Sequence, residues 1–508
     1  MQNDDALSFA HRPFTPRPIH KVLVANRGEI AVRVIRGCHE RGIRTVAVFS
    51  EADRAALHVR AAYEAVCIGP APSRESYLRM DAVIQAALDT GADAIHPGYG
   101  FLSENAAFAR AVMDAGLIWI GPPPEAIDAM GSKTACRQRM EAAGVPCVPG
   151  TLEPLSDEEV IRLAAEVGFP IMLKAAAGGG GKGMRRVDDP ADLPGALRAA
   201  RSEARSSFGD DAVYIEKFVL NPRHVEVQVL ADRYGATVHL FERDCSIQRR
   251  NQKVVEESPC PVLPHETRLA MTEVAVRAAR AVGYESAGTC EFLLGGDGAF
   301  YFLEMNTRLQ VEHPITELVT GVDLVHAQLR IAAGEPLWFK QEDLSQSGHA
   351  IELRVYAEDP ENNWAPSPGK VTGYREPGGP WVRVDGGVYQ GGTVPLYYDP
   401  MVAKLIVWGT DRDAAIARAQ RALLEYRVRG IRTSIPFFRA LLDDPDFRAG
   451  RYTTGFLDAA RMSRLNQASH NDEVAILAAA IAALEHDMAV TRPADTSEKA
   501  SPWRWSYR

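Results

Sequence analysis

Two acidic residues lie opposite each other in a predicted β-hairpin in the middle of the chain. The β-type runs 289–294 and 300–305 are joined by the turn sequence Gly-Gly-Asp-Gly-Ala. A hairpin symmetric about this turn places Glu291 opposite Glu304, with Cβ atoms about 5 Å apart. Asn306 follows Glu304 at period two and shares its face. Two carboxylates and an amide oxygen suit Mg²⁺ or Mn²⁺. The alternative, an exposed acidic hairpin, is disfavoured by the apolar residues that flank the acids.

A glycine-rich segment flanked by lysines forms a second feature. Gly178 to Gly183 lies between Lys174, at the end of an apolar run, and a short β-type run from Met184 to Val187. Its spacing does not match a Walker A loop, and a dinucleotide fingerprint would have to open a helix instead of a strand. We therefore expect a hairpin whose tip covers phosphates with backbone N–H groups. A flexible surface loop is the alternative.

Two polar runs could complete a site next to bound phosphates. The run from Arg308 to Pro314 contains a cation, a carboxamide and the possible general base Glu312. The run from Arg243 to Lys253 is basic and rich in amides, which suits anions. A salt-bridged loop is the alternative for the first run, and a solvated charged face is the alternative for the second.

The elements that must position these residues divide the chain into several regions. After a lead of residues 1–18, strands alternate with helices over 19–124, which predicts a parallel sheet covered by helices. Residues 125–336 read as helices with antiparallel hairpins, and residues 349–460 are rich in Gly, Pro, Val and Tyr. The tail, 461–508, contains a predicted amphipathic helix from Asp472 to Met488.

Composition excludes several classes of protein. The chain has 508 residues, 46% of them hydrophobic, which is enough for two to four domains. Its net charge of -9 argues against nucleic-acid binding through phosphate neutralisation. Seven scattered cysteines with no C-x-x-C pair favour neither a zinc site nor a disulfide framework. Without a signal peptide or an apolar run of membrane-spanning length, the expected location is the cytoplasm, with no membrane partner.

Seven collinear segments, spread from about Ile19 to Leu457, resemble the biotin carboxylase family of the ATP-grasp superfamily. They are the Gly-rich loop and the segments Ala25-Asn-Arg-Gly-Glu-Ile30, His96-Pro-Gly-Tyr-Gly-Phe-Leu-Ser-Glu-Asn105, Ile247-Gln-Arg-Arg250, Lys253-Val-Val-Glu-Glu257, Glu304-Met-Asn-Thr-Arg-Leu-Gln-Val-Glu-His-Pro314 and Tyr397-Tyr-Asp-Pro-Met401. The resemblance implies a Rossmann-like N-domain, an ATP-grasp domain with a mobile Gly-rich lid at about 150–220, and a C-terminal biotin carboxylase domain.

The resemblance also assigns residues to roles. The ATP-binding set is Lys133, Lys174, Gly180, Gly181, Met184, Glu216, Lys217, Phe218, Val219, His224, Gln248, Asn251 and Leu293. The metal set is Glu291, Glu304 and Asn306, in agreement with the hairpin. The bicarbonate and biotin set is Lys253, Arg308, Gln310, Val311, Glu312, Tyr99 and Arg354, of which Arg308, Glu312 and Lys253 would be catalytic.

The implied reaction is the carboxylation of biotin with ATP, bicarbonate and two Mg²⁺ or Mn²⁺ ions. The chain contains no Ala-Met-Lys-Met attachment sequence, so we expect biotin on a separate carrier protein and carboxyltransferase subunits on other chains. Arg33, Arg36 and Glu40 share one helix face that matches the family's dimer interface, which predicts a homodimer. Asn251 and Ala177 lean toward propionyl-CoA-type members, but the acyl acceptor stays open.

Two other functions remain to be compared with this one. A carboxylate-amine ligase of the ATP-grasp superfamily would keep the metal hairpin, but it does not need Arg308, Glu312 and Lys253 arranged around bicarbonate. A non-catalytic nucleotide-binding regulatory subunit would be expected to lack Glu312 or a metal ligand, and this sequence retains them.

Overall fold

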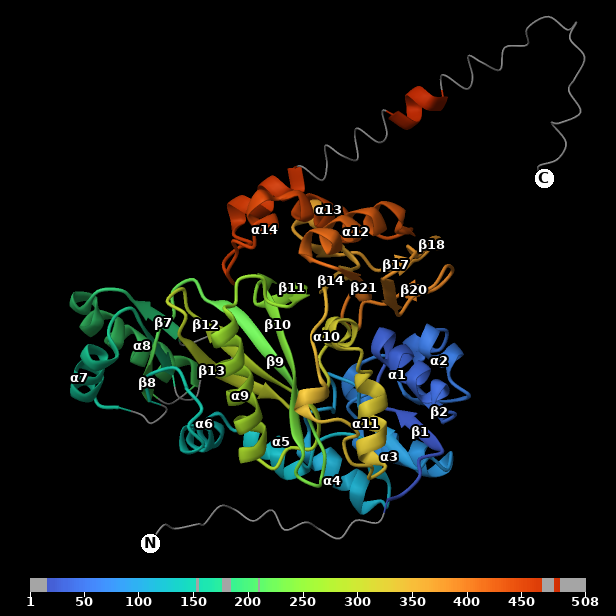
Figure 1. Ribbon diagram of the computed structural model, residues 1–508, viewed down its shortest axis with the longest axis horizontal. Helices are drawn as coiled ribbons and strands as arrows, with labels where there is room; N and C mark the ends of the chain where they lie inside the picture. Colours follow the sequence, from blue (N-terminus) through green and yellow to red (C-terminus); the bar gives the residue numbers. More distant parts are fainter. Residues whose placement is uncertain (1–15, 152–154, 176–183, 209–210, 468–478, 485–508) are drawn as a thin grey trace, which may run out of the picture.

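Two large β-sheets of different kinds form the framework of the chain (Figure 1). One has five strands and lies in the N-terminal part, and the other has eight strands and joins the central and C-terminal parts. The structure is a computed structural model, and it describes residues 16–151, 155–175, 184–208, 211–467 and 479–484.

The N-terminal sheet is parallel, as the alternation of strands and helices predicts. Its strand order is β3-β2-β1-β4-β5, and every neighbouring pair is parallel. Its strands are β1 (Lys21–Val24), β2 (Arg44–Ser50), β3 (Glu64–Gly69), β4 (Ala94–His96) and β5 (Ile118–Trp119). The helices of this region are α1 (Gly28–Glu40), α2 (Leu57–Ala61), α3 (Met80–Asp89), α4 (Ala106–Asp114) and α5 (Pro124–Gly131).

A small three-stranded sheet and two helices form a separate layer at one side of the molecule (Figure 1). Its members are β6 (Ile171–Ala175), β7 (Met184–Val187), β8 (Val213–Lys217), α7 (Asp157–Val167) and α8 (Leu193–Phe208), and α6 (Lys133–Ala142) precedes them. β6 and β7 are antiparallel with Lys174 paired to Met184, so the predicted strands on both sides of the Gly-rich segment are confirmed. Residues 176–183, which include Gly180 and Gly181, lie outside the described residues.

The eight-stranded sheet has the order β13-β12-β9-β10-β11-β14-β21-β19 and crosses from the central to the C-terminal part of the chain. The crossing is the antiparallel pair β11–β14, in which Val255 pairs with Leu353. The strands are β9 (Arg223–Ala231), β10 (Thr237–Arg249), β11 (Gln252–Ser258), β12 (Ser286–Leu294), β13 (Phe300–Asn306), β14 (His349–Tyr356), β19 (Val382–Gly386) and β21 (Met401–Gly409).

Helices cover this sheet, and short strand pairs complete the C-terminal part. The helices are α9 (His265–Ala281), α10 (His313–Thr320), α11 (Leu324–Ala332), α12 (Arg412–Glu425), α13 (Ile435–Asp443) and α14 (Pro445–Arg448). The short pairs are β15 (Glu358–Asp359) with β16 (Ala365–Pro366), β17 (Gly369–Lys370) with β20 (Thr393–Val394), and β18 (Gly373–Arg375) with β22 (Arg427–Arg429).

The alternation of side chains along each strand places core residues on one face of the sheet and polar residues on the other. In β9, Val225, Val227 and Val229 pack in a core that includes residues of α9, so the alternate residues His224 and Glu226 face the opposite side. In β14, Ile351, Leu353 and Val355 pack in a core with residues of α12 and α13, which leaves Arg354 on the other face. The same period of two therefore brings polar side chains of distant strands onto one face of the sheet.

The C-terminal part lies close against the first helix. A Cβ added to Gly387 would lie 2.7 Å from the backbone nitrogen of Glu29, so a larger residue could not be accommodated without movement. α1 itself begins at Gly28, whose φ of +66° favours glycine. This contact places the start of α1 beside the C-terminal strands.

The three α1 residues of the predicted dimer face differ in burial. Arg33 is buried and ion-paired with Glu317 at 2.9 Å. Arg36 and Glu40 are exposed. The i, i+3, i+7 spacing gives the angle around a helix but cannot show that another part of the chain covers one residue of the set.

In the tail, the structure describes only residues 479–484 of the predicted helix 472–488. Residues 479–484 are helical, and their apolar side chains Ile481 and Leu484 are exposed. The rest of the predicted helix, the end of the tail and residues 1–15 of the N-terminal lead lie outside the described residues.

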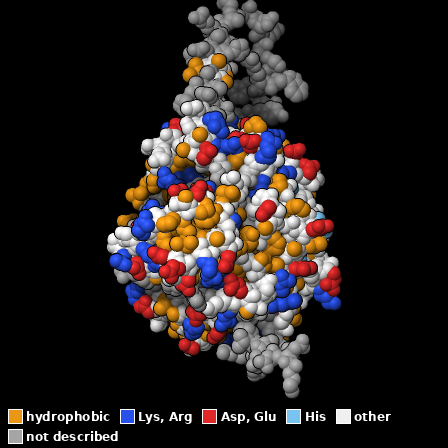
Figure 2. Space-filling view, turned by 90° about the vertical axis from the view of Figure 1, so that its left-hand side faces the viewer, with side chains coloured by type: hydrophobic (Ala, Val, Ile, Leu, Met, Phe, Trp, Pro, Cys, Tyr) orange, Lys and Arg blue, Asp and Glu red, His pale blue; other side chains and the backbone are white. Residues whose placement is uncertain are grey.

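Charge is evenly mixed on the surface shown in Figure 2. Lys and Arg side chains are interspersed there with Asp and Glu, in keeping with 57 basic and 66 acidic residues in the whole chain. Among the described residues, no helix is long and apolar enough to cross a membrane.

Candidate active site

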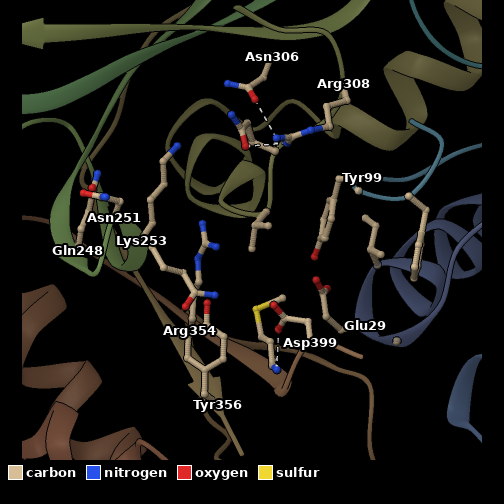
Figure 3. A pocket seen from close by; sticks show the side chains of 18 of the residues that line it. Glu29, Tyr99, Gln248, Asn251, Lys253, Asn306, Arg308, Arg354, Tyr356 and Asp399 are labelled. Carbon is tan, nitrogen blue, oxygen red and sulfur yellow. Dashed lines mark hydrogen bonds between the residues drawn. The ribbon is translucent and has the colours of Figure 1, made fainter. Parts of the chain in front are cut away.

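A cavity of about 960 Å³ lies where the N-terminal, central and C-terminal parts meet (Figure 3). Figure 3 shows Glu29 and Tyr99 on one side of it, Lys253 and Gln248 on the other, and Arg354 between them. The cavity brings together the predicted bicarbonate and biotin residues, except the fully buried Glu312, with several ATP and metal residues. Its lining includes Tyr99, His224, Gln248, Asn251, Lys253, Glu291, Leu293, Glu304, Asn306, Arg308, Gln310, Val311 and Arg354.

The predicted opposition of Glu291 and Glu304 is confirmed, although the hairpin is not symmetric. Near the turn, Phe292 pairs with Phe302, and a register shift follows, so that Leu303 is an extra residue in β13. Without this bulge, Glu291 would pair with Leu303 instead of Glu304. The bulge therefore places both carboxylates on one face.

Glu304 has the character of a cation ligand. Desolvation and repulsion from Glu291 and Glu104 raise its pKa above the usual value. Glu291 instead has a lowered pKa, because Lys253 and His224 outweigh the effect of its burial. A carboxylate that is destabilised by a facing carboxylate, beside the amide of Asn306, fits a divalent cation bound through oxygen atoms.

A partly buried lysine pairs with three carboxylates at the centre of the site. Lys253 Nζ lies 2.6 Å from Glu226, 2.9 Å from Glu291 and 2.7 Å from Glu312. Burial alone would lower the pKa of Lys253, but the three carboxylates raise it well above its usual value. Lys253 is therefore a fixed positive charge in this structure.

Glu312 is held ionised by two cations. Its carboxylate accepts hydrogen bonds from Lys253 at 2.7 Å and from Arg354 Nη2 at 2.9 Å. Glu312 is fully buried, yet Lys253, Arg354 and Arg243 lower its pKa well below the usual value. It stands at the N-terminus of α10, which also favours a negative charge.

Arg308 is oriented by three acceptors. It donates to Asn306 Oδ1 at 2.8 Å (Figure 3). It also donates to the side-chain oxygens Gln310 Oε1 and Glu104 Oε2, each at 2.9 Å. Gln310 in turn donates to Glu291 at 3.2 Å. The guanidinium is thus linked to two of the predicted metal ligands.

A second cavity, of about 420 Å³, adjoins the first at β13. It is lined by Lys174, Glu216 and Met305 among others, and Leu303, Glu304 and Asn306 line both cavities. Lys174 forms an ion pair with Glu216 inside it. The predicted metal hairpin therefore stands between a space that contains predicted ATP-binding residues and a space that contains Lys253, Arg308 and Arg354.

The remaining predicted ATP-binding residues are less closely grouped. Lys217 Nζ donates to the carbonyl of Gly168 at 2.8 Å, which turns its side chain to the backbone. Phe218 packs under the guanidinium of Arg186, and Val219 follows β8. Lys133 begins α6 and Met184 begins β7.

Several residues of the site escaped the sequence analysis. Glu226 is fully buried and pairs with both Lys253 and Arg243. Glu256 accepts from Arg354 Nε at 2.6 Å, and Glu104 accepts from Arg308. Glu226 offered a signal, because it is an acid in a strand whose alternate residues Val225, Val227 and Val229 are apolar.

Three family models match the chain in sequence order. They describe the biotin carboxylase N-terminal domain over residues 18–127, the carbamoyl-phosphate synthase L chain ATP-binding domain over 132–340, and the biotin carboxylase C-terminal domain over 352–459. The chain belongs to the biotin carboxylase family. It is accordingly an enzyme, an ATP-dependent ligase that carboxylates biotin.

Curated relatives and a solved structure agree with this assignment. The chain is 53% identical to biotin carboxylase from Nostoc sp. over 439 residues, which covers 86% of this chain and 98% of that protein. It is 52% identical to biotin carboxylase 1 from Bacillus subtilis over 442 residues, with 87% and 98% covered. It resembles the biotin carboxylase domain dimer of Hydrogenobacter thermophilus 2-oxoglutarate carboxylase, bound to MgADP, ADP and bicarbonate, with a TM-score of 0.79, 48% identity, and 86% and 97% covered.

Proposed function

We propose that this chain carries out the first half-reaction of a biotin-dependent carboxylase, with the residue roles given below. The observation that carries this proposal is the meeting of two cavities at Glu304 and Asn306. One contains Lys174 and Glu216, and the other contains the cluster around Lys253. A nucleotide bound in the cavity with Lys174 would direct its terminal phosphate at bicarbonate bound in the cavity with Lys253.

The nucleotide and metal sites follow from this arrangement. ATP would be held by Lys133, Lys174, Gly180, Gly181, Met184, the segment Glu216 to Val219, His224, Gln248, Asn251 and Leu293. Glu291, Glu304 and Asn306 would hold two Mg²⁺ or Mn²⁺ ions. When bound, these cations neutralise charge that develops on the phosphoryl oxygens. The relative with MgADP and bicarbonate supports this set.

Bicarbonate would lie between Lys253, Arg308, Gln310 and the backbone of Val311. Glu312 removes its proton, and the resulting oxyanion attacks the γ-phosphorus, which releases ADP and forms carboxyphosphate. Carboxyphosphate then breaks into CO₂ and phosphate. Phosphate takes the proton from biotin N1′, and this nitrogen attacks CO₂ while Arg308 stabilises the enolate oxygen. Tyr99 and Arg354 would line the biotin side.

Bicarbonate binding must also change the charge balance of Glu312. Its two carboxylate oxygens are engaged by Lys253 and Arg354, which makes it a weak base in the structure. An anion that draws these cations toward itself would raise the basicity of Glu312 at the moment when it is needed.

The domain limits proposed are 19–124, 125–336 and 349–460, with the lid at about 150–220 and a tail from 461. The proposed assembly is a homodimer that acts with a carrier protein and carboxyltransferase subunits on other chains. The dimer in the H. thermophilus relative supports the proposed homodimer. All seven cysteines are free, which is compatible with the proposed cytoplasmic location.

The test is bicarbonate-dependent ATP hydrolysis with free biotin and then with a biotinylated carrier. We expect ADP release that requires bicarbonate and rises when biotin or the carrier is added. ADP release that requires an amine and a carboxylate substrate, and that ignores bicarbonate, would favour the carboxylate-amine ligase instead. A streptavidin blot of the purified chain should be blank, and biotin bound covalently to this chain would contradict the separate carrier.

A further inference from the structure

A third cavity, large enough for a small molecule, lies on the other side of the β10–β11 turn from the active site. Its volume is about 780 Å³, within the range of small-molecule sites. Arg249 and Arg250 of the turn line it, whereas their neighbours Gln248 and Asn251 line the active-site cavity. The cavity is completed by the segment around Trp364 and by the helical residues 459–467.

Two buried donors in its wall lack acceptors. Arg249 is 9% exposed and Trp364 is 6% exposed. Arg249 Nε and Trp364 Nε1 have no hydrogen-bond partner among the described residues. A buried N–H group without an acceptor loses its hydrogen bonds to water and gains none in return, so a folded protein rarely retains two such groups in one wall.

The two groups are held rigidly in place. The Arg249 guanidinium stacks on the Trp364 ring at 4.3 Å and donates through Nη2 to Glu358 at 2.6 Å. Trp364 packs edge-on against Phe437 with ring centroids 4.8 Å apart. Its backbone has a φ of +59°, a strained value for a large side chain. Such strain persists where the surrounding contacts require it.

The helical residues 459–467 supply an acceptor. Asn466 donates its Nδ2 to the carbonyl of Pro360 at 2.7 Å, which fixes the amide, and its buried Oδ1 has no donor among the described residues. Leu457 and Met462 add apolar surface. The exposed Arg250 adds positive charge, the charge of Arg249 is balanced by Glu358, and the acidic Glu361 also lines the cavity.

We propose that this cavity binds a small carboxylate that has a hydrocarbon body and a hydroxyl group. The carboxylate accepts from Arg249 Nε and Trp364 Nε1 near Arg250, the hydroxyl donates to Asn466 Oδ1, and the hydrocarbon packs on Met462 and Leu457. The site is separate from the proposed catalytic residues, so its failure would leave the proposed function untouched.

Calorimetric titration of the full-length chain tests the site. The probes are 3-hydroxyhexanoate, hexanoate and hexanamide, added while MgADP and bicarbonate saturate the active site. We expect saturable binding in that order of affinity, because hexanoate lacks the hydroxyl and hexanamide lacks the charge. No saturable heat up to about 10 mM 3-hydroxyhexanoate, or equal affinity for hexanamide, would overturn the proposal.

Two substitutions locate the binding. Trp364→Phe keeps the ring but removes the N–H, and Asn466→Ala removes the acceptor. Each should weaken binding of 3-hydroxyhexanoate by about 10-fold, and Asn466→Ala should leave hexanoate binding unchanged. Arg464→Gln, on an exposed residue of the same helical segment, is the control and should bind like wild type. Unchanged binding in both Trp364→Phe and Asn466→Ala would place the ligand elsewhere and overturn the site.

Discussion

At the scale of single residues, the site consists of charged side chains that are paired with charges of opposite sign. Lys253 alone contacts Glu226, Glu291 and Glu312, each within 2.9 Å. Arg243 and Arg354 supply further positive charge to Glu226 and Glu312. Buried charges are tolerated when they are paired in this way, and removing one partner leaves an unpaired charge. Glu304, opposite Glu291, has a raised pKa, and the proposed cation would supply the same balance there.

Glu304→Gln should therefore abolish ATP turnover, because it removes one of the two charged ligands that face the metal. The change is nearly isosteric and should leave the fold intact. Bicarbonate-dependent ADP release is the measurement, and Glu342→Gln, at an exposed position, is the matched control. Near wild-type turnover in Glu304→Gln would show that the hairpin does not bind the metal.

Glu312→Ala should separate chemistry from nucleotide binding. Lys253 keeps Glu226 and Glu291, and Arg354 keeps Glu256, so neither cation is left alone. We expect ATP affinity close to wild type and turnover lower by roughly 10²-fold or more, the usual effect of losing a general base. A collapse of ATP affinity, measured by titration, would instead indicate a structural role for Glu312.

At the scale of elements, the buried carboxylate of Glu257 links the two strands of the β11–β14 pair in the eight-stranded sheet. Glu257 of β11 accepts from His349 of β14 at 2.6 Å and from Arg412 of α12 at 2.7 and 3.0 Å. Tyr452 also donates to it. Burial alone would raise the pKa of Glu257, but His349 and Arg412 lower it to about 2. One carboxylate thus links two strands, a helix and the segment after α14.

Glu257→Gln should lower the thermal midpoint. The pKa of Glu257 is about 2 when folded and 4.5 when unperturbed, so its ionisation stabilises the fold by up to about 3 kcal/mol above pH 4.5. That contribution disappears as pH falls from 4.5 toward 2. The difference between variant and wild type should therefore be full near neutral pH and shrink at acid pH. Scanning fluorimetry over this window tests it, with exposed Glu273→Gln as control; a difference independent of pH would contradict the ionic account.

At the scale of the whole molecule, α1 links the active site to the proposed dimer face. Arg33, on its inner side, pairs with Glu317 of α10, whereas Arg36 and Glu40 remain exposed. Arg383 of β19 also pairs with Glu317, at 2.7 Å. The helix that follows Glu312 is therefore held from both the N-terminal and the C-terminal parts.

The proposed homodimer predicts a solution mass of twice the chain mass of 55.5 kDa. Light scattering at micromolar concentration measures it. Arg36→Glu, at the exposed face, should shift the mass toward the monomer, while Arg464→Gln, on a distant exposed surface, should not. A monomeric wild-type chain would contradict the dimer.

The sequence by itself determined the features that depend on neighbouring residues. Apolar runs that alternate with helical segments predicted the parallel N-terminal strands. Hairpin symmetry predicted that Glu291 lies opposite Glu304, and period two placed Asn306 on the face of Glu304. The collinear motifs identified the family. These succeeded because strand and helix periodicity is set by local backbone geometry, which the order of residue types reports directly.

Only the tertiary structure decided which distant groups meet. Lys253 and Glu312 are 59 positions apart, and Arg354 and Glu256 are 98 apart, so no local pattern could pair them. The bulge at Leu303 and the burial of Arg33 likewise depend on what packs against β13 and α1. The sheet that joins the central and C-terminal parts has the same origin, because strand pairing is chosen by the path of the whole chain rather than by either strand alone.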